Sequence, residues 1–149
     1  RYVAFQSEAT NLVTGDTNGV SDVFVHDRVA GTTERVSVST GGAEADDGCF
    51  SPVISADGRF VMFATMATNL VAGDTNGKND HFLHDRTTGE TVRVNYTYTG
   101  GQEPDAGDTG PCGFSGDNAY VLYTTAGASV PLDTNGEYDV YMRPNPLAP

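Results

Sequence analysis

Short apolar runs separated by glycine-rich and aspartate-rich turns are the main pattern of this chain. The clearest run is RFVMFAT, in which Phe60, Met62 and Ala64 share one face of an extended strand. It belongs to a group of four runs whose short connections, ADG and TTGE, are typical of hairpin turns, and whose longer connection contains GDTNGKND. The pattern predicts a four-stranded antiparallel meander with strands at 49–55, 59–65, 81–86 and 91–96.

This unit is repeated along the chain. GDTNGVSDVFVHD at 15–27 returns as GDTNGKNDHFLHD at 73–85, and LDTNGEYDVYM at 132–142 is a shorter third copy. The second DTNG follows the first after 58 residues, and the third follows after another 59. Repeats of roughly 40–60 residues with about four strands each are typical of β-propeller blades.

We therefore predict an all-β fold made of β-propeller blades, each a four-stranded antiparallel meander. The first and third copies supply further strands at 1–7, 22–28 and 33–38, and near 112–116, 119–125 and 139–143. The chain is then one propeller segment, 1–149, of about two and a half to three blades. Its blade repeats are expected at approximately 1–48, 49–108 and 109–149.

A segment of this size is a partial ring, because propellers close with about four to eight blades. Its outer blades would expose sheet edges and apolar faces. We expect the chain to be a fragment of a longer protein, or a protomer whose partners are copies of itself or adjacent propeller blades.

The charge of the chain narrows the set of partners. With 8 Lys and Arg against 20 Asp and Glu, the formal net charge of −12 repels nucleic acid and anionic membrane surfaces. This charge argues against nucleic-acid binding. Membrane insertion is not expected either, because no apolar run is long enough to span a bilayer. The chain begins without Met and directly in a strand-like run, which suggests a processed protein or a piece of a longer one.

The segment SPVISADGRFVMFAT (51–65), followed by HFLHDRTTGETVRVN (81–95), resembles the TolB-type propeller repeat. Blades of that family read roughly Ser-Pro-x-x-Ser-x-Asp-Gly-Arg-x-x-x-Phe, then an aromatic strand that ends in Asp, then a glycine turn. The third copy departs from this pattern, with SGDNAY in place of SADGRF and YMRPN in place of FLHDR. The resemblance implies a β-propeller in a secreted or periplasmic protein, and it implies little about ligands because propellers host many functions.

All three copies contain the pattern Asp-x-Asn-Gly-x-x-Asp, which has the spacing of a calcium loop. Ca²⁺ takes about six to eight oxygen ligands, and a tight loop supplies them from alternate positions around a glycine. The first, third and seventh positions would offer side-chain oxygens, and the fifth a backbone carbonyl. The predicted ligands are Asp16, Asn18, Val20 and Asp22 in the first copy, Asp74, Asn76, Lys78 and Asp80 in the second, and Asp133, Asn135, Glu137 and Asp139 in the third.

These loops resemble the central part of the calcium loops in integrin-type propellers, but Thr14, Ala72 and Pro131 stand where an upstream acid would be. Two carboxylates and one amide in each loop predict modest calcium affinity. A metal-free turn is the alternative, because Asn and Gly tolerate positive φ and Asp accepts bonds from nearby amides. The seventh-position aspartate favours calcium, since a turn alone does not require a carboxylate there.

Two cysteines stand beside the first strands of successive blades. Because the acidic chain is expected to be exported, they predict a disulfide between Cys49 and Cys112, with buried free thiols as the alternative.

The sequence has no clear enzyme signature. His26 and His84 occupy equivalent places in VHDR and LHDR, but no nucleophile recurs with them and Arg143 stands there in the third copy. We interpret the two histidines as structural, and His81 as a surface position. Paired-histidine zinc motifs, phosphate loops and dinucleotide fingerprints are missing, so the chain is predicted not to be an enzyme.

Together these features predict a non-catalytic, calcium-binding β-propeller module that acts as a structural scaffold or as a protein- or glycan-binding surface. Ca²⁺ is the expected cofactor, and an extracellular, cell-surface or periplasmic location is expected because calcium is abundant there. The acidic inter-blade loops 39–48 and 98–110 are candidate binding surfaces. The alternatives are a carbohydrate-binding propeller lectin formed by oligomerisation, and an accessory propeller of a larger secreted hydrolase.

Overall fold

The computed structural model of the chain describes residues 1–103, 110–127, 129–131, 133 and 136–149. The described residues form ten β-strands: β1 (Tyr2–Ser7), β2 (Asp22–Asp27), β3 (Thr32–Arg35), β4 (Cys49–Ile54), β5 (Phe60–Thr65), β6 (Asp80–Asp85), β7 (Glu90–Arg93), β8 (Pro111–Phe114), β9 (Tyr120–Thr125) and β10 (Asp139–Pro144). Among these residues there is no apolar helix of the length needed to cross a membrane.

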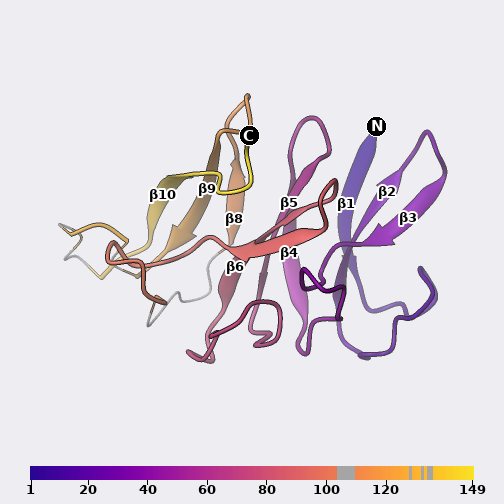
Figure 1. Cartoon of the computed structure of the whole chain (residues 1–149), viewed down its shortest axis with the longest axis horizontal. Helices are drawn as coiled ribbons and strands as arrows, with labels where there is room; N and C mark the ends of the chain where they lie inside the picture. The colour runs from indigo at the N-terminus through magenta and orange to yellow at the C-terminus, as the bar shows by residue number, and fades with distance from the viewer. Residues whose placement is uncertain (104–109, 128, 132, 134–135) are drawn as a thin grey trace.

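The strands form three antiparallel sheets that stand side by side along the molecule (Figure 1). Their strand orders are β1-β2-β3, β4-β5-β6-β7 and β8-β9-β10, and each sheet falls within one sequence repeat. The middle sheet is a complete four-stranded meander. In the described part of the chain, the first sheet has no strand before β1 and the last has none after β10. The predicted all-β, partial-ring propeller architecture is confirmed.

The last strands of the first two sheets, β3 and β7, are shorter than the alternation predicts. β3 ends at Arg35 and β7 ends at Arg93, although the apolar pattern continues for three more residues. A second, local pairing follows each strand: Val38 forms a bridge with Glu44, and Tyr96 forms the equivalent bridge with Gln102. The amides of Val36 and Val94 still bond the carbonyls of Val23 and His81 at 2.9 and 2.8 Å, and each segment then folds back on itself in a tight turn.

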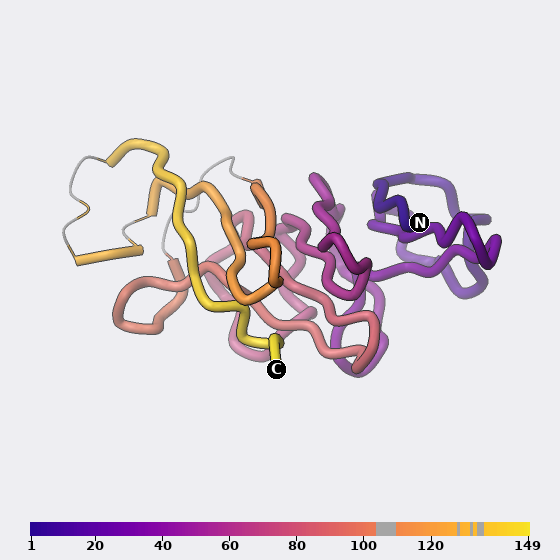
Figure 2. The backbone as a smooth tube through the Cα atoms, turned by 90° about the horizontal axis from the view of Figure 1, so that it is seen from above, coloured from indigo at the N-terminus to yellow at the C-terminus, as the bar shows by residue number. Residues whose placement is uncertain are grey.

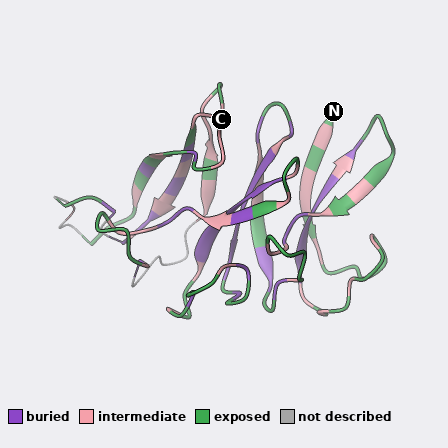
Figure 3. Ribbon diagram, in the orientation of Figure 1, coloured by how far each residue is buried: buried purple, intermediate pink, exposed green. Residues whose placement is uncertain are grey.

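The core lies between the sheets, in two layers. The layer between the first and middle sheets is formed mainly by Val23, Val25, Val61, Phe63 and Phe82. The layer between the middle and last sheets is formed mainly by Phe60, Met62, Leu83, Val121 and Tyr123. Alternate residues of β5 serve different layers, so every residue of β5 and β6 is buried (Figure 3). The middle sheet is therefore covered on both faces.

Polar side chains join the sheets at their edges. Between the first two sheets, Arg86 donates to Glu34 at 2.5 Å, and Asp46 accepts the amide and hydroxyl of Thr68 at 2.7 and 2.9 Å. Between the middle and last sheets, the buried Glu103 accepts the hydroxyl of Thr125 at 2.8 Å. Viewed from above, the chain passes from one sheet to the next in order (Figure 2). The blades are thus linked by hydrogen bonds as well as by apolar packing.

The hairpin turn of the third repeat forms in spite of its altered sequence. In the middle sheet Asp57 accepts the hydroxyl of Ser55 at 2.6 Å, and Gly58 has φ of +79°. In the last sheet Asp117 accepts the hydroxyl of Ser115 at 2.6 Å, and Asn118 occupies the left-handed position with φ of +60°. Asparagine tolerates that conformation better than other non-glycine residues, so SGDNAY builds the same turn as SADGRF.

Removing a side chain from the layer between the first two sheets should destabilise the whole chain. Phe63→Ala removes a fully buried ring that stacks on Phe82 at 6.0 Å, and should lower the free energy of unfolding by about 3–5 kcal/mol. Urea unfolding followed by circular dichroism measures this loss. The half-exposed Phe50 is the matched control, because Phe50→Ala should cost about 0.5 kcal/mol or less. Equal losses in the two variants would contradict the assigned core.

Candidate metal centre

The first DTNG loop connects β1 to β2 and brings three carboxylates together. Asp16, Asp22 and Glu44 each have an oxygen within 4.8 Å of the others. Glu44 lies in the turn after β3 and is held there by Thr17, whose amide and hydroxyl donate to its two oxygens at 2.8 and 2.5 Å. The hydroxyl of Ser37 donates to Asp22 at 2.5 Å. The cluster is thus built from two sequence segments, the loop itself and the turn after β3.

A guanidinium group stands among these carboxylates. Nη1 of Arg35 lies 2.5 Å from Glu44, 3.4 Å from Asp22 and 3.4 Å from Asp16, and Nη2 donates to the carbonyl of Gly15 at 3.2 Å. One positive charge therefore faces three negative charges. Oδ1 of Asp16, the oxygen that faces Nη1 of Arg35 at 3.4 Å, is buried and accepts no hydrogen bond, and the side chain is 3% exposed.

The second DTNG loop, between β5 and β6, repeats this arrangement with one carboxylate fewer. Nη1 of Arg93 lies 3.6 Å from Asp74 and 3.9 Å from Asp80. Gln102 takes the place of Glu44 and donates to Asp74 at 2.5 Å, and Asn95 donates to Asp80 at 2.6 Å. The second cluster therefore has two carboxylates for one arginine.

The asparagine of each loop serves the turn. Oδ1 of Asn18 accepts the amide of Val20 at 3.3 Å, and its Nδ2 donates to Asp22 at 3.0 Å and to the carbonyl of Ala45 at 3.2 Å. Asn76 likewise accepts the amide of Lys78 at 3.0 Å. These are the bonds that the metal-free alternative predicts. For Asn18 or Asn76 to bind a metal ion, its side-chain amide group would have to rotate.

In each of the first two loops, the ionised form of one aspartate is disfavoured. Burial raises the pKa of Asp16, and the neighbouring Asp22 adds to this effect. Burial and Asp80 together raise the pKa of Asp74 to about 6. In contrast, hydrogen bonds from Thr17 lower the pKa of Glu44 to about 2. Raised values at Asp16 and Asp74 mean that the ionised form is under-stabilised there, which is the condition that a bound cation relieves.

The third loop is described only in part. Asn135 lies outside the described residues. Asp133 accepts a hydrogen bond from the hydroxyl of Tyr141. Glu137 is exposed, and Asp139 is the first residue of β10. The position that corresponds to Arg35 and Arg93 would fall beyond residue 149.

Four residues of these clusters escaped the sequence analysis. They are Arg35, Arg93, Glu44 and Gln102. The signal for them is present in the repeat, because each pair is separated by the same 58 residues as the DTNG loops. They were missed because they stand outside the loop motif, on β3 and β7 or in the turns that follow these strands, and only the fold brings them to the loop.

The three histidines have different environments. The imidazoles of His26 and His84 bond the hydroxyls of Thr33 and Thr91 at 3.0 and 2.8 Å, which gives each a structural contact. The surface position expected for His81 is wrong. His81 is fully buried between the middle and last sheets, 3.1 Å from the carbonyl of Thr124. Alternation along one strand did not reveal this, because both faces of β6 are covered.

The predicted disulfide is also wrong for this structure, in which Cys49 and Cys112 are both free thiols. Cys49 is buried at the start of β4, whereas Cys112 is exposed on β8. In the paired register, Pro111 stands opposite Tyr123 on β9 while Cys49 stands opposite Thr65 on β5. The two cysteines therefore occupy different levels of neighbouring strands, one inside the core and one outside it. Burial raises the pKa of Cys49 to about 12, which keeps this thiol protonated.

Comparison with solved structures settles the architecture. TolB from Acinetobacter baumannii matches 89% of this chain with a TM-score of 0.52 and 17% sequence identity. A TolB-type protein from Agrobacterium tumefaciens matches 96% of it with a TM-score of 0.54 and 13% identity. The fold is that of a TolB-like β-propeller.

This likeness concerns the fold alone, because the identities are low. The chain covers 26% and 38% of the length of those two structures, so it corresponds to a part of each propeller. No family model matches the chain, and no curated protein matches it either. The site residues of this TolB-like segment therefore have to be judged from their own geometry.

The thiols should be distinguishable by their accessibility. In the native, unreduced protein one thiol, Cys112, should react with a colorimetric thiol reagent, and unfolding should expose Cys49 as the second. A titration before and after addition of guanidinium measures both. Cys112→Ser is the control, and it should abolish the native reaction. If the denatured protein has no free thiol, the structure is contradicted and the predicted disulfide between Cys49 and Cys112 is correct.

Acid should weaken the contact around His81. Burial lowers the pKa of His81 to about 4, below its usual value near 6.5, so the native state holds the neutral imidazole. Its contribution to stability is complete above about pH 6.5 and is lost as the pH falls towards about 4. His81→Gln, which does not titrate, should lose less stability than wild type over this interval in thermal melts. Parallel profiles for wild type and His81→Gln would contradict the assignment.

Proposed function

We propose that this chain is a non-catalytic TolB-like propeller segment that works as a scaffold outside the cytosol, and that its DTNG loops bind Ca²⁺. The observation that carries the proposal is the charge balance at the first loop. Three carboxylates share one guanidinium there, and a buried oxygen of Asp16 has no hydrogen-bond partner. One divalent cation would compensate the two remaining negative charges.

The donor set fits the chemistry of calcium. Carboxylate oxygens are the ligands that Ca²⁺ prefers, and those of Asp16, Asp22 and Glu44 are already gathered. When bound, the ion supplies positive charge that fixes the loop in one conformation. Glu44 then ties the loop to the turn after β3, which Thr17 already contacts through two hydrogen bonds. Water or backbone carbonyls would complete the coordination, as expected for a site of modest affinity.

Arginine is the competing cation at this position. Arg35 approaches the same three carboxylates, so calcium and the guanidinium would have to share them or the guanidinium would have to withdraw. At the second loop the balance is different, because Arg93 faces two carboxylates and Gln102 replaces the third. We therefore assign the stronger calcium site to the first loop and a weaker one to the second.

A scaffold role accords with the rest of the site. His26 and His84 each bond a threonine hydroxyl, and Asp27 and Asp85 accept backbone amides of the turns that follow them. These polar side chains therefore stabilise the blades through hydrogen bonds. The loop tips on this framework, such as the one that carries the exposed Tyr98, are the surfaces that a protein or glycan ligand would contact.

Calcium should raise the melting temperature of the chain. At a calcium concentration of about ten times Kd, binding adds about 1.4 kcal/mol, which corresponds to about 3–6 °C for a chain of this length. Thermal melts in a chelator, in calcium and in magnesium measure the effect, and magnesium should give a smaller shift. Asp16→Asn should remove most of the calcium response, and Asp74→Asn a smaller part of it.

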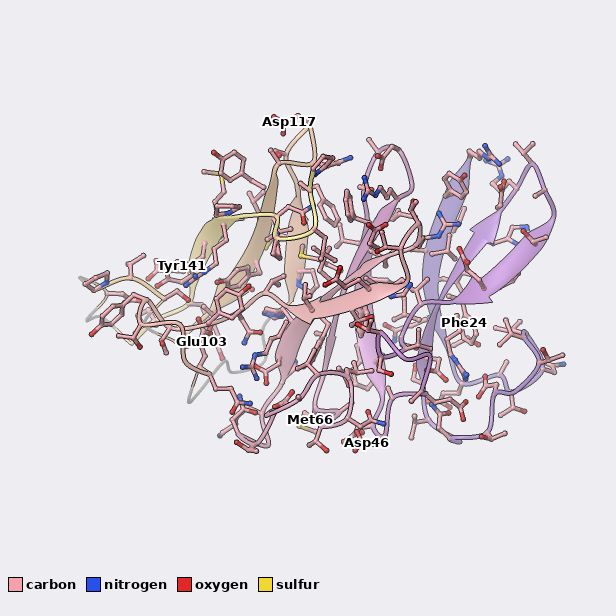
Figure 4. The ribbon with its side chains drawn as sticks, in the orientation of Figure 1. Phe24, Asp46, Met66, Glu103, Asp117 and Tyr141 are labelled. Carbon is pink, nitrogen blue, oxygen red and sulfur yellow. The ribbon has the colours of Figure 1, made fainter. Side chains whose placement is uncertain are left out.

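Two further variants make this test decisive. Asp117→Asn also removes one negative charge, but Asp117 lies at the opposite end of the sheets from the DTNG loops, so it should leave the calcium response intact (Figure 4). Arg35→Gln removes the competing cation and should enlarge the response to calcium. If calcium stabilises neither wild type nor Arg35→Gln, the loops are metal-free turns balanced by arginine, and the calcium proposal is wrong.

A further inference from the structure

The turn that follows the first sheet reaches across to the outer strand of the middle sheet. Residues 38–44 form a small hairpin of their own, closed by the bridge between Val38 and Glu44. Thr40 stands near the tip of this hairpin, is exposed to solvent, and bonds to β7. We call residues 38–44 the strap, because they join the first sheet to the edge of the middle one.

β7 lies at one edge of the middle sheet among the described strands, and the backbone at its centre points outwards. Val94, just after β7, donates to the carbonyl of His81 at 2.8 Å. Hydrogen-bonded and non-bonded residues alternate along an antiparallel pair, so the amide and the carbonyl of Thr91 point away from β6. Outward groups of this kind are the places where another strand can pair with a sheet.

The strap occupies these positions at Thr91. The hydroxyl of Thr40 accepts the amide of Thr91 at 3.0 Å and donates to the carbonyl of the same residue at 3.3 Å. One side-chain hydroxyl therefore makes both of the bonds that a residue of a paired strand would make there. The hydroxyl of Thr91 adds a third bond, to the carbonyl of Val38 at 2.6 Å.

The imidazole of His84 holds Thr91 in place from the other side. Thr91 gives its one hydroxyl proton to the carbonyl of Val38, so its Oγ1 accepts a hydrogen bond from Nδ1 of His84, at 2.8 Å. Thr91 is only 3% exposed, and its polar groups therefore depend on protein partners rather than on bulk water. Every hydrogen-bonding group of Thr91 that points to the edge is thus engaged by the strap.

From these contacts we infer that the strap blocks strand addition at the outer edge of the middle sheet. The strand that it excludes in a pure sample is the β7 of a second copy, because two antiparallel copies of the same edge can pair with each other. The inference does not depend on the calcium proposal, since the hydrogen bonds of Thr40 involve none of the carboxylates of the DTNG clusters.

Hydrogen exchange at the amide of Thr91 reports directly on the blocked edge. In Thr40→Ala this amide loses its acceptor, and in dilute protein it should exchange about tenfold faster than in wild type. Thr40→Ser keeps the hydroxyl and should keep the wild-type rate. Because Thr40 is exposed, Thr40→Ala should still fold, which thermal melts verify. Equal rates in wild type and Thr40→Ala would overturn the inference.

Thr99→Ala is the matched control. It removes an exposed threonine from the corresponding turn of the next repeat, which is closed by the bridge between Tyr96 and Gln102. Exchange at Thr91 should be the same in this variant as in wild type. A faster rate in Thr99→Ala would mean that loss of any turn threonine loosens the edge, and would also contradict the role of Thr40.

Raising the protein concentration in a chelating buffer tests the block itself. Light scattering should show that Thr40→Ala associates at lower concentrations than wild type, Thr40→Ser and Thr99→Ala. In the associated sample the amide of Thr91 should be protected again, because the strand of the neighbouring copy supplies the acceptor. If Thr40→Ala associates no more than wild type, the inference is wrong. It is also wrong if the associated protein still exchanges rapidly at Thr91, because the copies then meet elsewhere.

Discussion

Each sheet of this chain carries apolar side chains on both faces, and both faces are buried only when the sheet lies between two neighbours. The middle sheet meets this condition, with every residue of β5 and β6 buried. The outer sheets meet it on one side. This constraint explains why both core layers consist mainly of aliphatic and aromatic residues, and why Val3, Val140 and Met142 are exposed on the outer sheets.

The same constraint separates what the sequence predicts well from what it predicts poorly. Alternation and turn residues located the strands to within a few residues, because each hairpin is a local structure with its own signals. His81 was wrongly predicted at the surface because alternation assumes that one face of a sheet is exposed to solvent, and both faces of the middle sheet are covered. The cysteines were paired wrongly because proximity of two strands does not fix the level at which their side chains stand.

Only half of the residues that form the first loop cluster could be predicted from the sequence. The DTNG motif identifies Asp16 and Asp22, because they are close in sequence and the glycine between them demands a turn. Arg35 and Glu44 reach the same point from the end of β3 and the turn after it. Their arrival depends on β3 ending early and on the bridge between Val38 and Glu44, neither of which the apolar pattern indicates. A repeat-by-repeat comparison of charged residues would have recovered them, since Arg93 and Gln102 stand in register.

The loop cluster and the packing between blades are physically connected through Glu44. Its carboxylate faces Asp16 and Arg35, while its carbonyl accepts the side-chain amide of Asn69, from the loop of the next blade, at 2.7 Å. Any cation that fixes Glu44 therefore also fixes the segment on which the next blade rests. By linkage, a ligand that favours this ordered arrangement must bind more tightly when the neighbouring blade is in place. A cation bound at the first DTNG loop would therefore also stabilise the contact between the first two blades through Glu44 and Asn69.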